Sequence, residues 1–556
     1  MHHSKLLPLA LLALSSSVFA QQIPNAGSQL QQIPPAPTPE QPALKLNVEP
    51  RSGIASPAAD TAKITVNRLS ITGASVYSEA ELLAVTGFNP GSTLTLTELR
   101  GMGAKIADHY HRNGYFVAQA YLPAQDIKNG AVTIAVIEGR YGKVTLQNRS
   151  SLSDNVANRI LNGLNSGDII ASAPLESRLL LLSDLPGVSV KSTLIPGTAP
   201  GTSDLIIELQ PGKTISGSVD ADNAGSRYTG EYRVGATVNL NNLAGLGDVA
   251  SLRVLTSGSG LNYARISYQV PFGKAVVGAS YSYLTYSLGR EFESLDANGT
   301  AEVATLYGSY ALIRSRNTNL SAHLALDAKT FQDRIDLYSS LTDKKVQALT
   351  ASLTGDHRDN FAGGGASAFS LAWTTGNLDV ETPDVLRDDA IYAQTNGHYN
   401  KLGFSAMRSQ NVTDTVSLYG AINGQLASKN LDVSEKMSLG GMYGVRAYPV
   451  GEAYADEGYL LTLEARLLLP KFSQQMPGQM HLIAFVDSGS VRINKNVWDS
   501  SIDNRRTLSG GGIGFNWIDP GNFAVRTYYA HKIGNEAATS APDASGRFWI
   551  QAVKYF

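Results

Sequence analysis

Alternation of apolar and polar side chains over residues 213–556 limits the folds open to this chain. From Tyr459 to Leu469, Tyr, Leu and Ala take every second position, and Thr462, Glu464 and Arg466 lie between them. Successive side chains of a strand point to opposite faces. The run therefore predicts a strand with one lipid-like face and one charged face. We count about sixteen such runs, at roughly 21 residues per strand plus connection, which is what a transmembrane β-barrel of that size requires.

Length and hydrophobicity fit this reading without proving it. The 556 residues are too many for one ordinary domain. Hydrophobic residues make up 43% of the chain, yet no apolar run reaches the ~18–20 residues of a spanning helix. A closed barrel is the sheet that can span lipid, because closure leaves no unpaired edge. Composition alone is equally compatible with a soluble all-β protein.

Charge and cysteine content exclude several classes of function. The formal net charge is −2, and we see none of the basic stripes that nucleic-acid binding requires. There is no cysteine, which excludes disulfides, thiolate catalysis and Cys-ligated zinc. His109 and His111 would diverge by about 200° on a helix, so we expect no metal site.

Motifs for catalysis or cofactor binding are also missing from the sequence. The glycine run 510–514 lacks the Lys-Ser/Thr pair and the following helix of a phosphate loop. In a barrel strand, glycine more often marks a bend or a close approach. Glu464 and Asp487 could be imagined as paired carboxylates for hydrolysis, but lumen-facing polar residues are the simpler interpretation. We find neither a Gly-x-Ser-x-Gly elbow nor a His-Glu-x-x-His motif, so we expect no enzyme and no cofactor.

The N-terminal 62 residues read as a leader and a linker. Residues 1–20 have the apolar core (6–14) and the small-residue cleavage site (18–20) of a secretory signal. Residues 21–62 are rich in Pro, Gln and Ala, with a Pro cluster at 34–39. Such a segment favours an extended, semi-rigid conformation.

Residues 63–212 predict two similar units, 63–141 and 142–212, each in the order β-α-α-β-β. Ser78 and Thr95, each followed three residues later by Glu, predict capping boxes that open two helices. The other elements that we expect are a strand at 64–71 with a phase slip at Asn67-Arg68, strands at 116–122, 131–137, 143–146, 188–194 and 205–209, and helices at 153–164 and 172–185.

Two motifs near the C-terminus stand out. One is the segment Gly444-Val445-Arg446-Ala447-Tyr448, which carries a single cation in a Gly- and Tyr-rich stretch. The other is Phe485-Val486-Asp487-Ser488-Gly489, an alternating run with an acid on its polar face. An Arg at a loop tip and an Asp on a neighbouring wall indicate a loop, around 437–456, folded back into the barrel and held there.

These motifs resemble the Val-Arg-Gly-Tyr loop and the Phe-x-Asp-x-Gly wall of the POTRA-bearing outer-membrane secretion and assembly superfamily. Within it, the chain is similar to two-partner secretion transporters (TpsB, the haemolysin-activator family). The two β-α-α-β-β units match the POTRA module, and the run 222–248 is similar to the first hairpin of TpsB barrels. In one departure, Ala447 stands where the family has Gly, and we expect the loop to tolerate a methyl unless the position needs a positive φ.

The resemblance implies a sixteen-stranded barrel in a Gram-negative outer membrane, with two POTRA domains in the periplasm. Residues 26–32 resemble the plug helix of these transporters, although a disordered tail is an equal alternative. Implied partners are a secreted TpsA-type exoprotein, outer-membrane lipids and, through the terminal aromatic Phe556, the barrel assembly machinery.

The function implied is transport of the unfolded exoprotein to the cell surface without ATP. Cargo in this family is a haemolysin, an adhesin, a haem-binding protein or a contact-dependent toxin. An assembly factor for other barrels is the first alternative, although that class usually strings three or more POTRA domains together. A passive porin is the second, although porins lack the POTRA segment.

Overall fold

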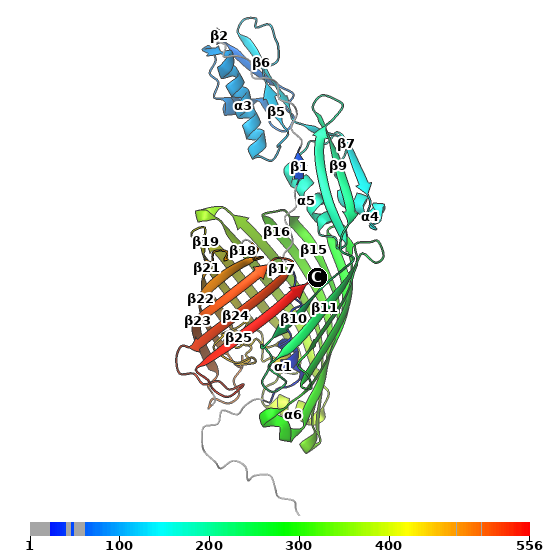
Figure 1. Cartoon of the computed structure of the whole chain (residues 1–556), viewed down its shortest axis with the longest axis vertical. Helices are drawn as coiled ribbons and strands as arrows, with labels where there is room; N and C mark the ends of the chain where they lie inside the picture. Colours follow the sequence, from blue (N-terminus) through cyan, green and yellow to red (C-terminus); the bar gives the residue numbers. More distant parts are fainter. Residues whose placement is uncertain (1–22, 40–45, 49–61, 474, 502) are drawn as a thin grey trace, which may run out of the picture.

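The computed structural model describes residues 23–39, 46–48, 62–473, 475–501 and 503–556. The predicted signal segment lies outside the described residues. Figure 1 shows two small α/β modules that follow one another along the long axis, and below them a large barrel that encloses helix α1 (Ala26–Gln31).

The barrel is closed and antiparallel, and each strand pairs with its neighbours in sequence. Closure joins the first and last strands, from Ser218 opposite Tyr555 to Asp222 opposite Gln551. This confirms the predicted sixteen-stranded fold. The strands are β10 Ile215–Asp222, β11 Arg233–Asn241, β12 Val249–Thr256, β13 Leu261–Phe272, β14 Ala275–Ser287, β15 Ala297–Arg314, β16 Thr318–Ile335, β17 Ser340–Asp359, β18 Gly365–Val380, β19 Gly397–Asn411, β20 Val416–Ala427, β21 Glu457–Leu468, β22 Gln479–Arg492, β23 Arg505–Asp519, β24 Phe523–Lys532 and β25 Gly546–Tyr555.

Short helices lie in the connections of the barrel. They are η1 Arg290–Leu295, η2 Asp336–Tyr338, η3 Phe361–Gly363, α6 Pro383–Ile391 and η4 Val433–Glu435. Helix α6 marks the end of the barrel opposite the two modules (Figure 1). No helix of the described residues is long and apolar enough to cross a membrane.

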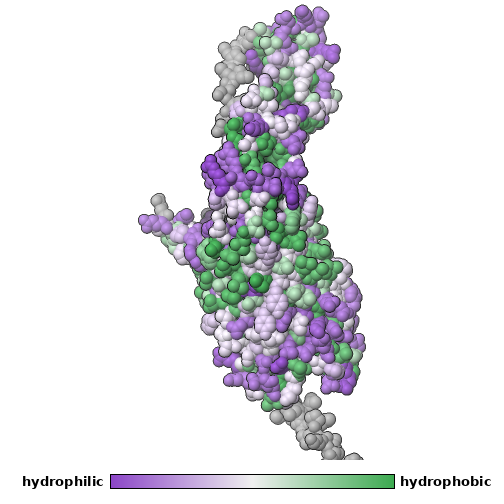
Figure 2. All heavy atoms as spheres, turned by 90° about the vertical axis from the view of Figure 1, so that its right-hand side faces the viewer, coloured by the Kyte–Doolittle hydropathy of each residue, from purple (hydrophilic) through white to green (hydrophobic). Residues whose placement is uncertain are grey.

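Alternation sorts the side chains of the barrel wall as predicted. On β21, Leu461 and Leu463 face outward and are 37% and 52% exposed, whereas Leu460 and Glu464 face the lumen and are 6% and 8% exposed. Figure 2 shows apolar residues as a green band across the face of the barrel that is turned to the viewer, with hydrophilic surface above and below it. A band of this kind is the lipid-facing zone of a transmembrane barrel.

The first module comprises β2 Lys63–Val66, β3 Arg68–Thr72, α2 Glu79–Thr86, β4 Ser92–Thr95, α3 Leu96–Arg112, β5 Gln119–Tyr121 and β6 Ala131–Ile137. The prediction of a single strand at 64–71 is wrong. It is two strands in different sheets, because the N–H groups of Asn67 and Arg68 both donate to the carbonyl of Gly130 and turn the chain between the sheets. Thr95 has the full capping box, whereas Ser78 caps its helix without the return bond.

A buried carboxylate, Glu138, organises the core of this module. It accepts hydrogen bonds from the N–H groups of Ser75 (2.6 Å) and Val76 (2.7 Å) and from the hydroxyl of Tyr110 (2.9 Å). Burial by itself would raise the pKa of the Glu138 carboxyl, but these hydrogen bonds, with a further one from the Ser75 hydroxyl, outweigh it and hold the pKa below its ordinary value.

The second module comprises β7 Arg140–Asn148, α4 Asp154–Leu161, α5 Ser172–Ser183, β8 Val188–Pro196 and β9 Thr202–Pro211. Its sheet has a further strand that the sequence did not predict, because β1 (Leu46–Val48) pairs in parallel with β8, and the order is β1-β8-β9-β7. The module rests on the near end of the barrel, where Asp184 accepts two hydrogen bonds of 2.7 Å from Arg314.

Candidate functional site

The connection between β20 and β21, residues 428–456, folds back into the barrel instead of projecting from it. An antiparallel bridge joins Met437 to Ala455, and a parallel bridge joins Gly440 to Val445 nearer the tip, so the connection doubles back on itself. All five motif residues, 444–448, are buried. We call residues 428–456 the inner loop.

Arg446 at the tip of the inner loop contacts the carboxylate predicted for it. Its Nε and Nη2 donate to the two oxygens of Asp487, both at 2.8 Å, and its backbone N–H donates to the same carboxylate at 3.1 Å. The third donor, Nη1, lies 2.8 Å from Oε1 of Glu464. A guanidinium bound in this bidentate way to one carboxylate and also to a second is fixed in both position and orientation.

Aromatic side chains enclose the same guanidinium. Its central carbon lies 3.5 Å from the centroid of the Phe485 ring and 4.9 Å from that of Tyr528. The indole N–H of Trp549 donates to the carbonyl of Arg446 at 2.7 Å. Ring faces attract a cation most strongly where water is excluded, so the rings strengthen the site and also seal it.

The ion pairs of Arg446 are buried and are not open to the water of the lumen. The side chains of Arg446 and Asp487 are 5% and 0% exposed. The sequence pattern predicts Glu464 only as a lumen-facing residue, and it does not indicate Tyr528 or Trp549 as part of the site. Cross-strand position is the signal that connects Glu464 with Asp487. Thr462 lies opposite Asp487 in the strand register, and Glu464 is two residues further along β21, so it is the diagonal neighbour on the same face.

Gly489 and Ala447 are placed by close packing. A Cβ on Gly489 would lie 2.7 Å from the side chain of Leu439 in the inner loop, so the absent side chain leaves room for the loop. In the described part of the inner loop, the non-glycine residue with a positive φ is Ala453 and not Ala447. Ala447 is fully buried, and its methyl group is therefore accommodated without backbone strain.

The rest of the inner loop is tied to the barrel wall by charge. Glu435 accepts from Lys329 and Lys401, at 2.7 and 2.9 Å, and Asp432 pairs with Lys344 at 2.8 Å. On the far side, Glu452 accepts from Arg506 at 2.5 Å. The loop is therefore held at its base as well as at its tip.

Helix α1 lies beside the inner loop, in the segment that resembles a plug helix (Figure 1). The N–H of Ala26 donates to Asp333 on β16 at 2.7 Å. The side-chain amide of Gln31 donates to the carbonyls of Val433 and Lys436 in the inner loop, both at 2.7 Å. Because a Cβ on Gly27 would lie 2.8 Å from Cβ of Ser434, the glycine allows the helix to pack closely on η4.

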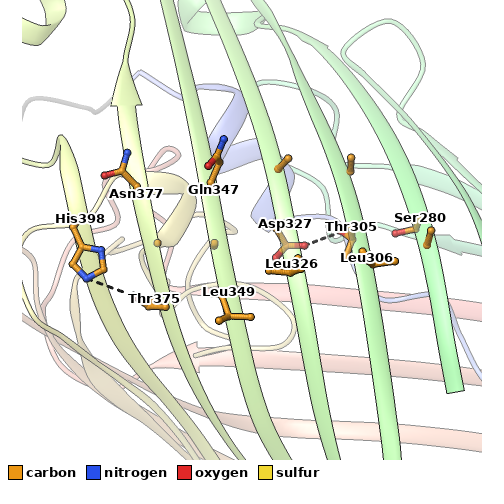
Figure 3. Close-up of a pocket in the computed structure, with 15 residues that line it drawn as sticks. Ser280, Thr305, Leu306, Leu326, Asp327, Gln347, Leu349, Thr375, Asn377 and His398 are labelled. Carbon is orange, nitrogen blue, oxygen red and sulfur yellow. Dashed lines mark hydrogen bonds between the residues drawn. The ribbon is translucent and has the colours of Figure 1, made fainter. Parts of the chain in front are cut away.

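A separate hollow of about 700 Å³ crosses strands β14 to β19 (Figure 3). Two of its lining residues, Leu306 and Leu326, are 54% and 49% exposed and belong to the outward-facing set. Asp327 accepts a hydrogen bond from Thr305 at 2.8 Å. The hollow is distinct from the Arg446 site, and no group of three or more His, Cys, Asp and Glu suited to a metal occurs among the residues that the structure describes.

Comparisons with known proteins agree with this geometry. The family described as Haemolysin secretion/activation protein ShlB/FhaC/HecB matches residues 201–517, and the ShlB-type POTRA domain matches residues 64–139. The Heme/hemopexin transporter protein HuxB of Haemophilus influenzae (strain 86-028NP) is 31% identical over 472 residues, which are 84% of this chain and 82% of HuxB.

More distant relatives have the same architecture. Outer membrane transporter CdiB of Dickeya dadantii is 23% identical over 81% of this chain and 79% of its own length. The solved structure of CdiB from Escherichia coli superposes with a TM-score of 0.71 at 21% identity, and covers 91% of this chain and 93% of that one; at this identity it shows the fold alone. From these matches the chain belongs to the ShlB/FhaC/HecB family, the outer-membrane transporters of two-partner secretion whose POTRA domains lie in the periplasm.

Proposed function

We propose that this transporter secretes one large exoprotein in an unfolded state, and that the inner loop and α1 keep the pore closed between transport events. The observation that carries the proposal is the buried Arg446 site inside the barrel, with Asp487 and Glu464 as its acceptors. We call this three-residue contact the Arg446 latch. A polypeptide that crosses the lumen needs the space of the loop tip and of α1, so both have to move.

Cargo recognition is proposed to use the sheet edges of the POTRA modules. An edge strand offers unpaired N–H and C=O groups, which an extended peptide can bond without requiring one exact sequence. Strand β1 pairs with β8 in parallel, from Leu46 opposite Ser192 to Val48 opposite Leu194. The β8 edge thus accepts an extended segment, and we propose that the N-terminal region of the cargo takes the place of β1.

Net direction is proposed to come from folding of the cargo outside the cell. The sequence contains no ATP-binding motif, and the periplasm is not expected to supply ATP. Burial of apolar surface and β pairing in the emerging exoprotein offset the conformational entropy lost in threading. Each folded segment then prevents the chain from sliding back.

The class of cargo is proposed from the relatives. Identity is 31% with the Heme/hemopexin transporter protein HuxB and 23% with CdiB of Dickeya dadantii. The higher value favours an exoprotein that is concerned with heme or hemopexin. Co-expression with such an exoprotein, followed by assay of the medium, tests this choice.

Deletion of residues 63–212 tests the transporter function itself against the porin alternative. A secretion transporter lacking its POTRA modules loses its cargo, because nothing presents the exoprotein to the pore. A porin would still conduct its solute. Continued secretion by the deletion variant, with the barrel present in the outer membrane, would refute recognition by these modules.

The β8 edge has a sharper test, because the chain contains no cysteine. Asn47 lies opposite Thr193 in the register of β1 and β8. In the oxidising periplasm, the pair Asn47→Cys and Thr193→Cys would lock β1 in place, and we expect secretion to stop and to return with reductant. The single variant Asn47→Cys is the control. Normal secretion by the cross-linked protein would show that cargo does not use this edge.

A further inference from the structure

The glycine run on β23 lies against the Arg446 latch. Gly510, Gly512 and Gly514 are the inward positions, since they lie opposite Asp487, Phe485 and Ile483 of β22. The intervening Ile513 is outward and 61% exposed. Every second residue of this stretch thus presents bare backbone to the lumen, directly beside the carboxylate that holds Arg446.

Each inward glycine leaves space for the loop tip or for one of the rings that surround Arg446. A Cβ on Gly510 would lie 2.5 Å from Cβ of Ala447. One on Gly512 would collide with the backbone carbonyl oxygen of Tyr529 and would lie 2.8 Å from Cζ of Phe485. A Cβ on Gly514 would collide with the ring of Tyr528. Phe485 and Tyr528 are the two rings that enclose the guanidinium. Gly510 therefore leaves room for the loop tip, and Gly512 and Gly514 leave room for the two rings that surround the guanidinium.

We infer that Gly510 is a positioning residue for the latch and that it forms a matched steric pair with Ala447. The space between β23 and the loop tip has room for one methyl group, and in this chain that group is the side chain of Ala447. The inference rests on the proposed role of the latch and deepens it, because it names what fixes the depth at which Arg446 reaches Asp487.

Close packing explains why a second methyl group, added at Gly510, cannot be accommodated beside that of Ala447. Gly510 is held in the ladder between Asp487 and Lys532, so β23 cannot retreat, and the methyl of Ala447 is fully buried. The loop tip then has to move, and the bidentate contact of Arg446 with Asp487 tolerates little displacement. Close-packed interiors respond to an added methyl by such shifts.

Four variants test the pair: Gly510→Ala, Ala447→Gly, the double variant, and Gly511→Ala. Gly511 is the matched control, because it has the same strand environment but its Cβ would point outward, 3.3 Å from Ile533. Hydrogen exchange of the amides of 444–448 is measured on the full-length protein in detergent, with heat-modified gel mobility to confirm that the barrel is folded. Ion conductance and secretion of the exoprotein are measured in parallel.

We expect Gly510→Ala to speed exchange of these amides about tenfold or more, because overpacking opens the loop locally. Ala447→Gly in the same chain should return exchange to within about threefold of the parent protein. Gly511→Ala should leave exchange unchanged. The inference fails if the amides of 444–448 exchange at the same rate in Gly510→Ala as in Gly511→Ala. It also fails if the effects of Gly510→Ala and Ala447→Gly on this rate simply add.

Failure of the steric pair and failure of the latch are distinguishable. If exchange shows the rescue but an Arg446→Ala variant secretes normally, the pair stands and the latch has no role in transport. If Arg446→Ala abolishes secretion but exchange shows no rescue, the latch stands and Gly510 does not position it. A Gly510→Ala barrel that folds only when Ala447→Gly is also present supports the pair through the rescue of folding.

Discussion

The inner loop and helix α1 lie side by side in the same lumen, yet different chemistry holds them. The loop tip is fixed by a buried cation with two carboxylates and two rings, and by a core of apolar side chains that includes Leu439, Val445 and Tyr448. Helix α1 is held by separate hydrogen bonds, those of Gln31 to backbone carbonyls and that of the Ala26 N–H to the Asp333 carboxylate. Its buried Ala26 and partly buried Leu30 join it to the apolar core.

This difference predicts two kinds of movement. Neutral hydrogen bonds exchange with water at small net free energy, about 0.5–1.5 kcal/mol each, so α1 can leave one contact at a time. A buried ion pair behaves as a unit, because removal of one partner strands the other. We therefore expect α1 to be a plug that detaches easily and the inner loop to have two discrete positions.

Replacement of Arg446 by Ala should have the largest effect. Asp487, fully buried, would be left without its cation, a loss of about 3–5 kcal/mol for the closed arrangement. The loop tip should leave its site so that water reaches Asp487, while the barrel remains in the membrane and secretion is abolished. Heat-modified gel mobility reports the barrel, and immunoblotting of the medium reports secretion.

Arg466→Ala is the matched control for that variant. Arg466 also donates to Glu464, at 2.8 Å, but its removal leaves the contact of Arg446 with Asp487 intact. We expect this control to secrete. Normal secretion by the Arg446→Ala variant would show that the latch has no role in transport.

Deletion of residues 23–32 should have an effect of intermediate size. Unlike Arg446→Ala, it should change ion conductance and leave secretion intact. Without α1, the ion conductance of the purified protein in planar bilayers should rise, because the helix no longer occupies the lumen. Secretion should continue, since the Arg446 latch is untouched. An unchanged conductance, or a loss of secretion equal to that of Arg446→Ala, would mean that helix and loop act as one element.

The smallest effect is expected for Glu138 in the first POTRA module, a buried carboxylate outside the barrel that can be compared with Asp487. Because hydrogen bonds hold the pKa of Glu138 below its ordinary value, the folded module binds this proton less readily than the unfolded one. Its contribution to stability is thus present above the ordinary value near pH 4.5 and is lost as the pH falls through the lower, folded pKa.

Proteolysis of the periplasmic modules in the full-length protein checks this dependence. Between pH 6 and 3.5 the parent module should become markedly more susceptible to cleavage. Glu138→Gln should be less stable by about 1–3 kcal/mol at neutral pH and should lose less stability as the pH falls. An equal pH slope in both proteins would assign the effect to other groups.

Prediction from sequence succeeded where the signal was local. Alternation along β21 and β22 predicts which side chains face lipid, because it depends only on the pleat. The first module shows the limit, since the strand predicted at 64–71 is divided by bonds to Gly130, about sixty residues away in sequence. The pairing of β1 with β8 likewise depends on backbone contacts between distant segments, for which no side-chain pattern exists.

The sequence by itself determined the barrel, its lipid-facing residues and the identity of the two motifs, because strand periodicity and motif spacing are properties of short segments. Only the tertiary structure decided that Arg446 is buried, that Glu464 shares it with Asp487, and that the glycines of β23 make room for the loop tip. Residues of β21, β22, β23, β24 and β25 all contact the loop tip at Arg446 and Ala447. These strands come together only once the barrel has closed.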